Sequence, residues 1–377
     1  MTDIASETPL YDVLVVGGGA AGVGTAVSLR HAGITNFAVI ERRSIGASFD
    51  AWPAETRFIT PSFPTNSIGM LDLNSIAIGA SPAWGLQVEH PTGREYAEHL
   101  RGVAQAFQLP VLEGTNVDAV GIAEDGDFAV ATSRGTLRAK CVVWAAGEFQ
   151  YPHLNGFAGS ELCRHTATIP SYREIEGDDF IVVGGYESGV DVAYHLACRG
   201  KRVRLFDRAC PWASETSDPS IALSTYSLER MRDPRFQAQV ELHPNAAVES
   251  VVFGGGLYEV ATGGGRFQTA SQPLYAGGFA GSHTLVADLF ESRPDGFPLL
   301  NEHDESTRTP GLYLCGPSVR HDNHVFCFIY KYRQRFGVVA RSIATSLGLA
   351  TDELEAYYRQ WGMLLDDLSC CGEECVC

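Results

Sequence analysis

The chain has few basic residues and no long apolar run. It carries 28 lysines and arginines against 45 aspartates and glutamates, a formal net charge of −17. This balance argues against a polyanion as the main partner, because nucleic-acid binding needs a basic surface. No uninterrupted apolar stretch is long enough to span a bilayer, and the start, MTDIASETPLYD, has neither a basic region nor an apolar run. We therefore expect a cytoplasmic protein without a signal peptide, a membrane contact or a nucleic-acid partner.

Disulfides are not expected in a reducing compartment, although ten cysteines are present. Six of them are scattered singly or lie in apolar patterns, as buried thiols do: Cys141, Cys163, Cys198, Cys210, Cys315 and Cys327. The other four crowd into the last eight residues, CCGEECVC: Cys370, Cys371, Cys375 and Cys377. That clustering needs an explanation of its own.

The strongest signal lies in residues 11–42, YDVLVVGGGAAGVGTAVSLRHAGITNFAVIER. Gly17 permits a tight turn, Gly19 lets a pyrophosphate approach the backbone, and Gly22 lets the following helix pack on the strand. The helix N-terminus offers free N–H groups to phosphate, and Glu41 ends the second strand where a carboxylate can bind a ribose. Strand, glycines, helix, strand and acid in this register predict a dinucleotide site.

A second strand–turn–helix–strand unit occupies residues 179–208, DFIVVGGYESGVDVAYHLACRGKRVRLFDR. Gly184, Tyr186 and Gly189 have the same spacing, with tyrosine at the position where backbone should approach the pyrophosphate. We predict a second nucleotide fold, with Ser188 and Gly189 at its cofactor.

The second unit ends in an acid followed by a base. Asp207 suits the ribose of NADH, whereas Arg208 suits the 2′-phosphate of NADPH. The residues leave both cofactors open.

Small-residue turns after the apolar strands at 141–147 and 274–279 are typical of crossings between two domains. We expect an α/β protein with two Rossmann-like dinucleotide-binding domains: residues 1–153 plus 277–377, and an inserted domain at 160–276. Glycine-rich residues 254–268 indicate strands with tight turns. Helices are expected at about 325–347 and 352–368.

Together these motifs resemble a flavoprotein with two dinucleotide-binding domains, over nearly the whole chain. That family combines an FAD fingerprint, an Ala-Gly crossing, an inserted NAD(P)H fingerprint and a late strand like TRTPGLYLCG, ending here at Gly316. The chain is most similar to bacterial flavin-containing monooxygenases, through the runs IGASFDAWPAETRFITPSFPTN, HDESTRTPG and FCFIYKYRQRF. The resemblance implies an FAD-dependent oxidoreductase that uses NADPH or NADH.

The resemblance also implies roles for individual positions. The ADP half of FAD would be held by Gly17, Gly19, Ala20, Ala21, Gly22, Glu41 and Arg42; Ser48 and Trp52 would lie near the ribityl chain and ring, and Val117 and Gly147 near the adenine.

The late strand departs from the family pattern. Most relatives end it with Gly-Asp, whose aspartate binds a ribityl hydroxyl, whereas this chain has Gly316-Pro317. Asp322 is the acid we expect in its place. A helix that starts around His324 would point its N-terminal dipole at the flavin.

Two related groups imply different reactions. The monooxygenase fingerprint F-x-G-x-x-x-H is partly matched by Phe157, Gly159 and His165, with the histidine two residues late; His165 is either catalytic or a satisfied hydrogen-bonding residue. The disulfide reductase side, including the bacillithiol disulfide reductase group, has a late segment similar to residues 322–326. That group carries a cysteine in its first glycine loop, where this chain has Ala21.

The tail offers three readings. As catalytic residues, Cys370, Cys371, Cys375 and Cys377 would accept electrons by thiol–disulfide exchange and pass them outward, although neighbouring Glu373 and Glu374 would raise the thiol pKa values. As metal ligands, the same four thiolates would favour Zn²⁺ or Cu⁺. The third reading is no role.

Three functions therefore stay open. The first is an FAD oxidoreductase that passes electrons to the tail and on to a thiol, disulfide or thiophilic metal. The second is an O₂-dependent monooxygenase of a small molecule, and the third is a flavin-bearing sensor that binds metal. A homodimer is possible in each case.

Overall fold

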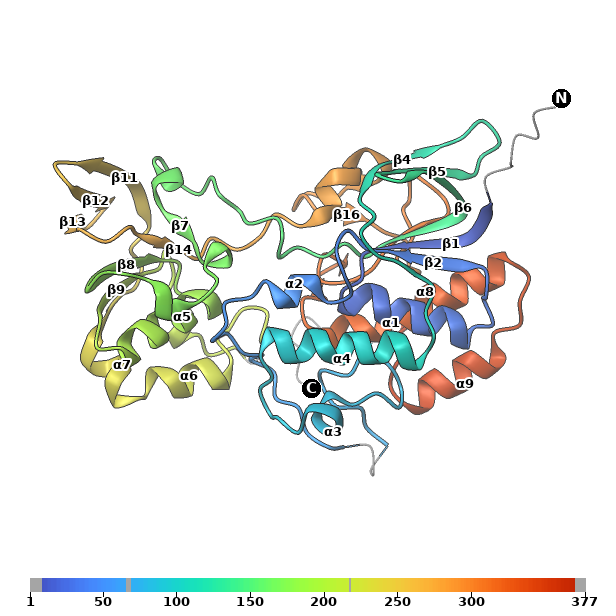
Figure 1. The fold of residues 1–377 in the computed structure, drawn as a ribbon, viewed down its shortest axis with the longest axis horizontal. Helices are drawn as coiled ribbons and strands as arrows, with labels where there is room; N and C mark the ends of the chain where they lie inside the picture. The colour runs from blue at the N-terminus through green and yellow to red at the C-terminus, as the bar shows by residue number, and fades with distance from the viewer. Residues whose placement is uncertain (1–8, 66–68, 217, 370–377) are drawn as a thin grey trace.

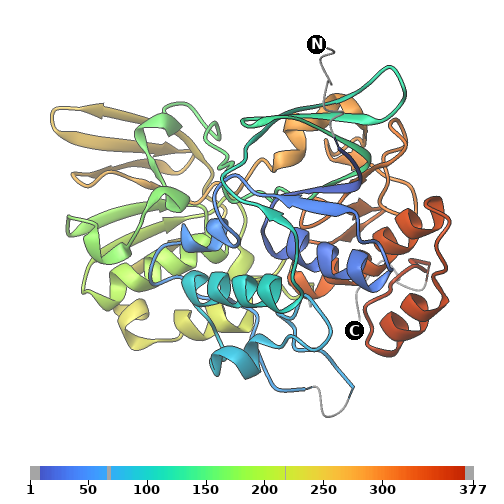
Figure 2. The same cartoon turned by 45° about the vertical axis from the view of Figure 1, so that its right-hand side comes forward.

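The computed structural model describes residues 9–65, 69–216 and 218–369. Two lobes lie side by side and are joined by two crossing segments (Figure 1; Figure 2 shows them turned by 45°). The four tail cysteines lie outside the described residues.

The larger lobe is built on a mixed sheet. Its strand order is β3 (Val111–Leu112), β2 (Phe37–Ile40), β1 (Leu10–Val16), β6 (Gly135–Trp144), β5 (Phe128–Thr132) and β4 (Val117–Ile122), with β17 (Leu312–Leu314) also paired to β6. β1 runs parallel to both β2 and β6, whereas β4, β5 and β6 form an antiparallel meander. Residues 13–16 are buried, as expected for a parallel strand covered on both faces.

Helices α1 (Ala20–His31), α4 (Gly93–Ala106) and α8 (Ile329–Ser346) pack beneath this sheet, and α9 (Asp352–Gln360) packs on α8 (Figure 1). α1 and α8 approach closely: a Cβ added to Gly24 would lie 2.2 Å from the Phe336 ring. A capping box of Thr92 and Glu95 starts α4. Short elements α2 (Ala47–Asp50), α3 (Pro82–Leu86), β15 (Glu291–Ser292) and β16 (Pro298–Leu299) complete the lobe.

The smaller lobe has a parallel sheet in the order β10 (Val240–His243), β9 (Arg202–Phe206), β8 (Asp179–Val183), β14 (Leu274–Tyr275) and β7 (Arg164–His165). Helices α5 (Glu187–Cys198), α6 (Thr225–Met231) and α7 (Pro234–Gln239) pack near it. The antiparallel strands β11 (Val248–Gly254), β12 (Leu257–Thr262) and β13 (Gly265–Thr269) confirm the prediction for the glycine-rich segment. The predicted α/β class with two nucleotide-binding folds is confirmed.

Two predicted helix boundaries are wrong. The helix expected from residue 325 begins at Ile329, because β18 (Arg320–His321) and β19 (His324–Val325) pair first as a hairpin. The helix expected over 352–368 ends at Gln360, and Gly362 has a φ of 63° that does not continue a helix. Among the helices of the described ranges, none is long and apolar enough to cross a membrane.

Candidate functional site

The first glycine-rich turn joins β1 to α1. Gly17 has a φ of 111°, and an added Cβ would lie 2.5 Å from the Ala145 carbonyl oxygen. A Cβ on Gly22 would lie 1.8 Å from the Gly17 carbonyl oxygen, whereas one on Gly19 would meet nothing within 4 Å. Gly17 and Gly22 are therefore required by packing, while Gly19 keeps a space open at the N-terminus of α1.

The acid after β2 borders this turn. One Glu41 carboxylate oxygen accepts a hydrogen bond from the Gly18 N–H at 2.7 Å, and the other accepts from the Arg43 N–H at 2.8 Å. The carboxylate is thus held at the edge of the open space, where the sequence predicted a ribose contact.

The second turn, between β8 and α5, repeats this geometry. Gly184 has a φ of 100°, and its added Cβ would lie 2.4 Å from the Ala276 carbonyl oxygen. A Cβ on Gly189 would lie 1.8 Å from the Gly184 carbonyl oxygen. The Gly185 N–H donates to the Asp207 carboxylate at 2.6 Å. Each turn therefore pairs with the acid at the end of its neighbouring strand.

Tyr186 occupies the middle position of the second turn without backbone strain. Its φ and ψ are −85° and −166°, against −86° and −169° for Gly19. Its hydroxyl lies 2.7 Å from the Pro219 carbonyl oxygen and 2.8 Å from that of Ala222. The tyrosine therefore keeps the backbone of the turn and directs its ring toward residues 219–222.

One cavity of about 1030 Å³ contacts both turns. Twelve of the predicted cofactor residues line it: Gly17, Gly19, Ala20, Ala21, Glu41, Arg42, Ser48, Trp52, Val117, Gly147, Ser188 and Gly189. Further aromatic side chains from both lobes complete its walls, and the Phe149 and Phe279 rings lie 5.4 Å apart. The two predicted nucleotide sites thus open into one space.

The first turn fits an FAD pyrophosphate. A Cβ on Gly19 or on Gly147 would meet no atom within 4 Å, so the backbone at both positions is open to a ligand. The uncapped N-terminus of α1 supplies unpaired N–H groups, which favour an anion.

Six predicted cofactor residues do not line the cavity, and three of them, Gly22, Gly184 and Gly316, support the turns. Gly22 and Gly184 support the turns from behind, as described above. Gly316, with a φ of 108°, backs onto the first turn, because its added Cβ would lie 3.1 Å from the Ala21 Cβ. Arg208 is exposed after β9.

Asp322 and His324, expected near the flavin, lie in the β18–β19 hairpin, and the helix start expected at His324 is wrong. Asp322 lies at the exposed tip of the β18–β19 hairpin with a φ of 47°, and its carbonyl oxygen accepts from Arg293 at 2.7 Å. Its side chain does not line the cavity. His324 belongs to β19 rather than to a helix start, and it is Phe328 and Ile329, at the beginning of α8, that reach the cavity.

His165 is a satisfied buried histidine. Its Nε2 lies 3.2 Å from the Gly278 carbonyl oxygen, and its Nδ1 accepts from the Ala167 N–H at 3.2 Å. Burial lowers the pKa of this imidazole, and His165 is absent from the cavity wall. These two contacts favour the hydrogen-bonding alternative for His165, and its catalytic role stays a prediction.

Only one of the six described cysteines, Cys327, lines the cavity. Its sulfur lies 3.2 Å from the Ser220 hydroxyl, and burial raises its pKa. Burial also raises the pKa of Cys141 to about 11 and those of Cys163 and Cys315 to about 12. In these four cysteines burial therefore favours the thiol over the reactive thiolate.

No cluster of metal-binding side chains occurs within residues 9–65, 69–216 and 218–369. The four predicted metal ligands of the tail, and the redox relay built on the same cysteines, lie outside those residues.

The run FCFIYKYRQRF at the start of α8 connects several segments. The Lys331 ammonium pairs with Asp218 at 3.0 Å, in the smaller lobe. The Arg335 guanidinium pairs with the buried Asp304 at 2.8 Å, and Asp304 also lies 2.5 Å from the His321 Nε2. The sequence used this run only as a family signature. In the structure it links α8 to Asp218 and to Asp304 through ion pairs.

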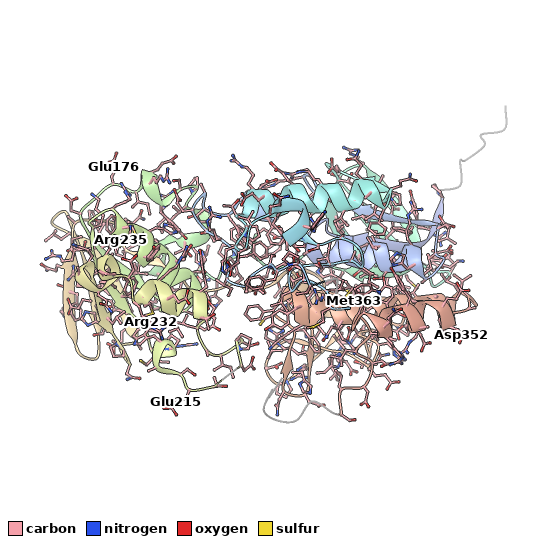
Figure 3. All side chains as sticks on the ribbon, turned by 90° about the horizontal axis from the view of Figure 1, so that it is seen from below. Glu176, Glu215, Arg232, Arg235, Asp352 and Met363 are labelled. Carbon is pink, nitrogen blue, oxygen red and sulfur yellow. The ribbon has the colours of Figure 1, made fainter. Side chains whose placement is uncertain are left out.

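A second set of contacts joins the lobes on the other side of the cavity. The Thr56 hydroxyl donates to the Asp191 carboxylate at 2.6 Å, and Glu55 accepts from the Tyr172 N–H at 2.8 Å. The His90 and Tyr226 rings stack at 4.1 Å. Seen from below in Figure 3, Arg232 and Glu215 lie in one lobe and residues 352–363 in the other.

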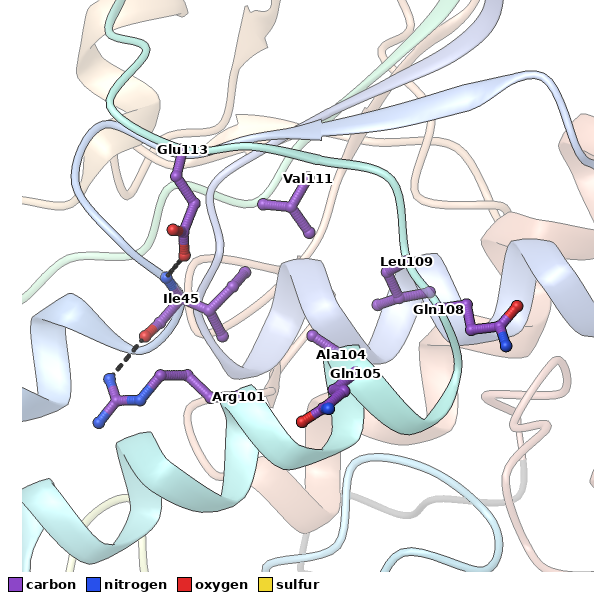
Figure 4. A pocket seen from close by; sticks show the side chains of 8 residues that line it. All are labelled: Ile45, Arg101, Ala104, Gln105, Gln108, Leu109, Val111 and Glu113. Carbon is purple, nitrogen blue, oxygen red and sulfur yellow. Dashed lines mark hydrogen bonds between the residues drawn. The ribbon is translucent and has the colours of Figure 1, made fainter.

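The loop that carries Ser48 to the cavity is held from its outer side. The Ile45 N–H donates to Glu113 at 2.8 Å, and the Arg101 guanidinium donates to the Ile45 carbonyl oxygen at 3.0 Å (Figure 4). A surface pocket of about 390 Å³ lies there, between α4 and β3. The two hydrogen bonds to Ile45 fix the loop between Arg43 and Ser48.

Sequence reasoning missed Glu148, which follows the Gly147 turn and lines the cavity. Burial raises the pKa of its carboxyl, and the positive charge of Arg320 opposes that shift. The only signal in the sequence was its place directly after the Ala-Gly crossing.

The sequence pattern of the family described as pyridine nucleotide-disulphide oxidoreductase matches residues 14–316. A bacilliredoxin reductase Bdr from Bacillus subtilis is 24% identical over 340 residues, which cover 88% of this chain and 97% of the relative. An uncharacterized CzcO-like oxidoreductase from Geobacillus kaustophilus is 30% identical over 50% of this chain and 52% of its own length. A Baeyer-Villiger monooxygenase from Streptomyces coelicolor is 28% identical over 58% of this chain and 42% of the relative. The chain thus spans about half the length of the last two.

Solved structures of both reaction types share the fold. The bacillithiol disulfide reductase Bdr of Staphylococcus aureus has a TM-score of 0.73 at 18% identity, covering 89% of this chain and 99% of that one. An ornithine N-hydroxylase from Kutzneria has a TM-score of 0.69 at 16% identity, covering 90% and 100%. The fold alone does not separate disulfide reduction from monooxygenation.

Proposed function

The chain belongs to the pyridine nucleotide-disulphide oxidoreductase family, and on that premise we propose that it transfers electrons from NADPH or NADH through FAD to a thiol or disulfide acceptor. The family consists of FAD-dependent oxidoreductases, and its relatives here include both disulfide reductases and monooxygenases. The thiol or disulfide acceptor is therefore what we propose beyond the family.

The observation that carries the proposal is the single cavity shared by the two glycine-rich turns. Two nucleotides bound at separate surfaces could not exchange a hydride, whereas two bound in one space can meet. Bound FAD would supply the chemistry of accepting a hydride and reducing the acceptor.

The residues of the chain would position the two nucleotides. We propose that Gly19 and the N-terminus of α1 hold the FAD pyrophosphate, that Glu41 binds its ribose, and that Val117 and Gly147 lie near the adenine. Ser188 and Gly189 would contact the NAD(P)H pyrophosphate at the start of α5. Aromatic side chains of the cavity wall, Trp52 among them, would shield the bound nucleotides from water.

The strand pairing supports the proposed domains, 1–153 plus 277–377 for FAD and 160–276 for NAD(P)H. All partners of β1 and β6 in the larger sheet lie in the first range, and all strands of the smaller sheet lie in the second. A cytoplasmic location and a homodimer remain predictions of the sequence.

The Bdr relative supports a disulfide acceptor, because it matches this chain over 97% of its own length. The first turn has Ala21, and among the described cysteines only Cys327, whose pKa is raised by burial, lies at the cavity, so the thiols that exchange electrons would be the tail cysteines Cys370, Cys371, Cys375 and Cys377.

The residues that line the cavity also favour a second candidate function. The described residues offer no reactive thiolate at the cavity, which suits an O₂-dependent monooxygenase of a small molecule. A flavin-bearing protein whose tail binds a thiophilic metal is the third reading, and it requires that NAD(P)H bind poorly at Tyr186.

Anaerobic stopped-flow mixing of the FAD-loaded protein with NADPH or NADH tests the proposal. We expect NADPH or NADH to bleach the flavin absorbance at least as fast as the enzyme turns over in the steady state. If neither does, both oxidoreductase candidates are wrong and the sensor reading gains support.

A Cys370→Ser/Cys371→Ser variant tests the tail, with Cys210→Ser, which does not line the cavity, as the control. We expect the tail variant to keep flavin reduction and to lose the reduction of a small aromatic disulfide such as 5,5′-dithiobis(2-nitrobenzoic acid). Unchanged disulfide reduction would remove the tail from the electron path and leave the monooxygenase reading.

A further inference from the structure

Four carboxyl groups line the cavity, and three of them are bound by the protein. Glu41 accepts two backbone N–H bonds, Glu187 accepts from Ser224 and Ser227, and Asp191 accepts from Thr56. No residue in the described parts of the chain gives the fourth, Glu148, a hydrogen bond or an ion pair. A half-buried carboxyl without a partner is costly to keep unless it serves a ligand or holds a proton.

Glu148 has a fixed place at the cavity wall. It follows the turn at Gly147, and its carbonyl oxygen accepts from the Tyr151 N–H at 2.8 Å. The next residue, Phe149, lies in a row of rings with Trp52 at 6.3 Å and Phe279 at 5.4 Å. The backbone turn and the aromatic row keep the carboxyl at the cavity rather than in bulk solvent.

The charged and titratable groups that act on Glu148 come from two other segments. Arg320 of β18 lines the cavity with its guanidinium tied to the Pro317 and Val319 carbonyl oxygens, at 2.5 and 2.7 Å. Cys327, just before α8, and Tyr332, in its first turn, line the same cavity. Burial raises the pKa values of both, so neither adds a negative charge near neutral pH.

Two influences oppose each other at this carboxyl. Removal from water favours the protonated acid, whereas the Arg320 charge favours the carboxylate. Removal from water is the larger influence, and the pKa of Glu148 is raised. The Arg320 guanidinium also donates hydrogen bonds to its two carbonyl partners, and it lies 4.2 Å from the centre of the Phe297 ring. Burial therefore favours the protonated form of Glu148 in a place that is open to a reactant.

We propose that Glu148 is the acid that delivers a proton to the acceptor in this cavity. The proposal rests on the proposed function and holds for both acceptors. Disulfide reduction, NAD(P)H + H⁺ + RSSR → NAD(P)⁺ + 2 RSH, consumes one proton besides the hydride. Monooxygenation, NAD(P)H + H⁺ + O₂ + S → NAD(P)⁺ + H₂O + SO, also consumes one. In each case Glu148 gives its proton to the departing thiolate or to the oxygen that leaves as water, and regains one from solvent.

Infrared spectroscopy of the FAD-loaded protein tests the protonation state without turnover. We expect the difference spectrum of wild type minus Glu148→Gln at pH 7 to contain the carbonyl stretch of a protonated carboxylic acid, sensitive to deuteration. Glu98→Gln, at an exposed position on α4, is the matched control and should lack that band. A carboxylate signal in its place overturns the proposal.

Kinetics separate this inference from the proposed function. In Glu148→Gln we expect NAD(P)H to bleach the flavin within twofold of the wild-type rate. Reoxidation by dioxygen or by an alkyl disulfide such as bis(2-hydroxyethyl) disulfide, whose departing thiolate must be protonated near neutral pH, should slow about 100-fold and lose its pH dependence, while Glu148→Asp recovers part of the rate. If wild-type flavin is not bleached at all, the proposed function fails. If bleaching is normal and reoxidation of the Gln variant is unchanged, only the role of Glu148 fails.

Discussion

The two glycine-rich turns have the same backbone but different surfaces. Gly17 and Gly184 approach the carbonyl oxygens of Ala145 and Ala276, and in both turns the second glycine N–H binds the acid of the neighbouring strand. The middle residues differ: the first turn has Gly19-Ala20-Ala21, and the second has Tyr186-Glu187-Ser188. The shared positions build the turn, and the three that differ determine what can lie against it.

Exchange of the middle residue should break the comparison with the largest effect. Gly19→Tyr places a side chain in the open space of the first turn, so we expect FAD affinity to fall about 1000-fold, or about 4 kcal/mol. The fold should persist, because Tyr186 has the same φ and ψ as Gly19. The ratio of flavin to protein absorbance and a titration with FAD measure the loss.

The reverse exchange, Tyr186→Gly, is the control and should leave FAD content unchanged. Full FAD occupancy in Gly19→Tyr would show that the pyrophosphate does not lie at this turn.

Alanine at the last glycine of each turn tests whether they are equivalent. In both, the new Cβ would start 1.8 Å from a carbonyl oxygen, so we expect Gly22→Ala and Gly189→Ala each to lower the free energy of unfolding by about 2 kcal/mol. Urea denaturation measures this. Gly102→Ala in α4, where a Cβ meets nothing within 4 Å, should be neutral or slightly stabilising. A severe effect at one turn alone would disprove the equivalence.

Tyr186→Phe sharpens the comparison by removing only the hydroxyl. The carbonyl oxygens of Pro219 and Ala222 lose their partner, so we expect the free energy of unfolding to fall by about 1 kcal/mol, with FAD binding unchanged. Thermal unfolding measures the shift against Tyr11→Phe, in which no such bond is lost. Equal shifts in the two variants would mean that Tyr186 does not anchor residues 219–222.

The smallest effect concerns pH and Glu187, which takes the place of Ala20 in the second turn. Burial raises the pKa of Glu187, although its bonds from Ser224 and Ser227 oppose this. A raised folded-state pKa gives stability that is complete below the unfolded value of about 4.3 and is lost as pH rises through the folded value.

Glu187→Gln should therefore flatten the decline of unfolding free energy between about pH 4 and 7, measured in urea at each pH. Glu98→Gln is the control and should keep the wild-type slope. A slope that steepens in Glu187→Gln would reverse the sign that we assign to burial.

Features fixed by neighbouring residues could be predicted from the sequence. Gly17, Gly22 and Glu41 act within one strand–turn–helix–strand unit, so their spacing was enough to identify the nucleotide fold. The helix boundary near His324 was missed because a β-hairpin competes there, and hairpin pairing depends on Asp322 accepting a positive φ.

The cavity wall itself could not be predicted, because it forms where distant segments meet. Glu148, Arg320 and Cys327 come from three places in the chain, and no spacing rule links them. The two alternatives for His165 stayed open in the sequence for a related reason: whether an imidazole is free or satisfied depends on Gly278, more than a hundred residues away.

The start of α8 also constrains how this sequence can vary among its relatives. Lys331 pairs with Asp218, Arg335 pairs with Asp304, and Arg333 donates to the Ser75 carbonyl oxygen at 2.9 Å. Because three alternate positions of one helix are tied to three other segments, a charge change at one member of either ion pair needs a matching change at the other. Such pairs should co-vary in an alignment, whereas cavity residues with no partner among the described residues, such as Glu148, should follow the substrate instead.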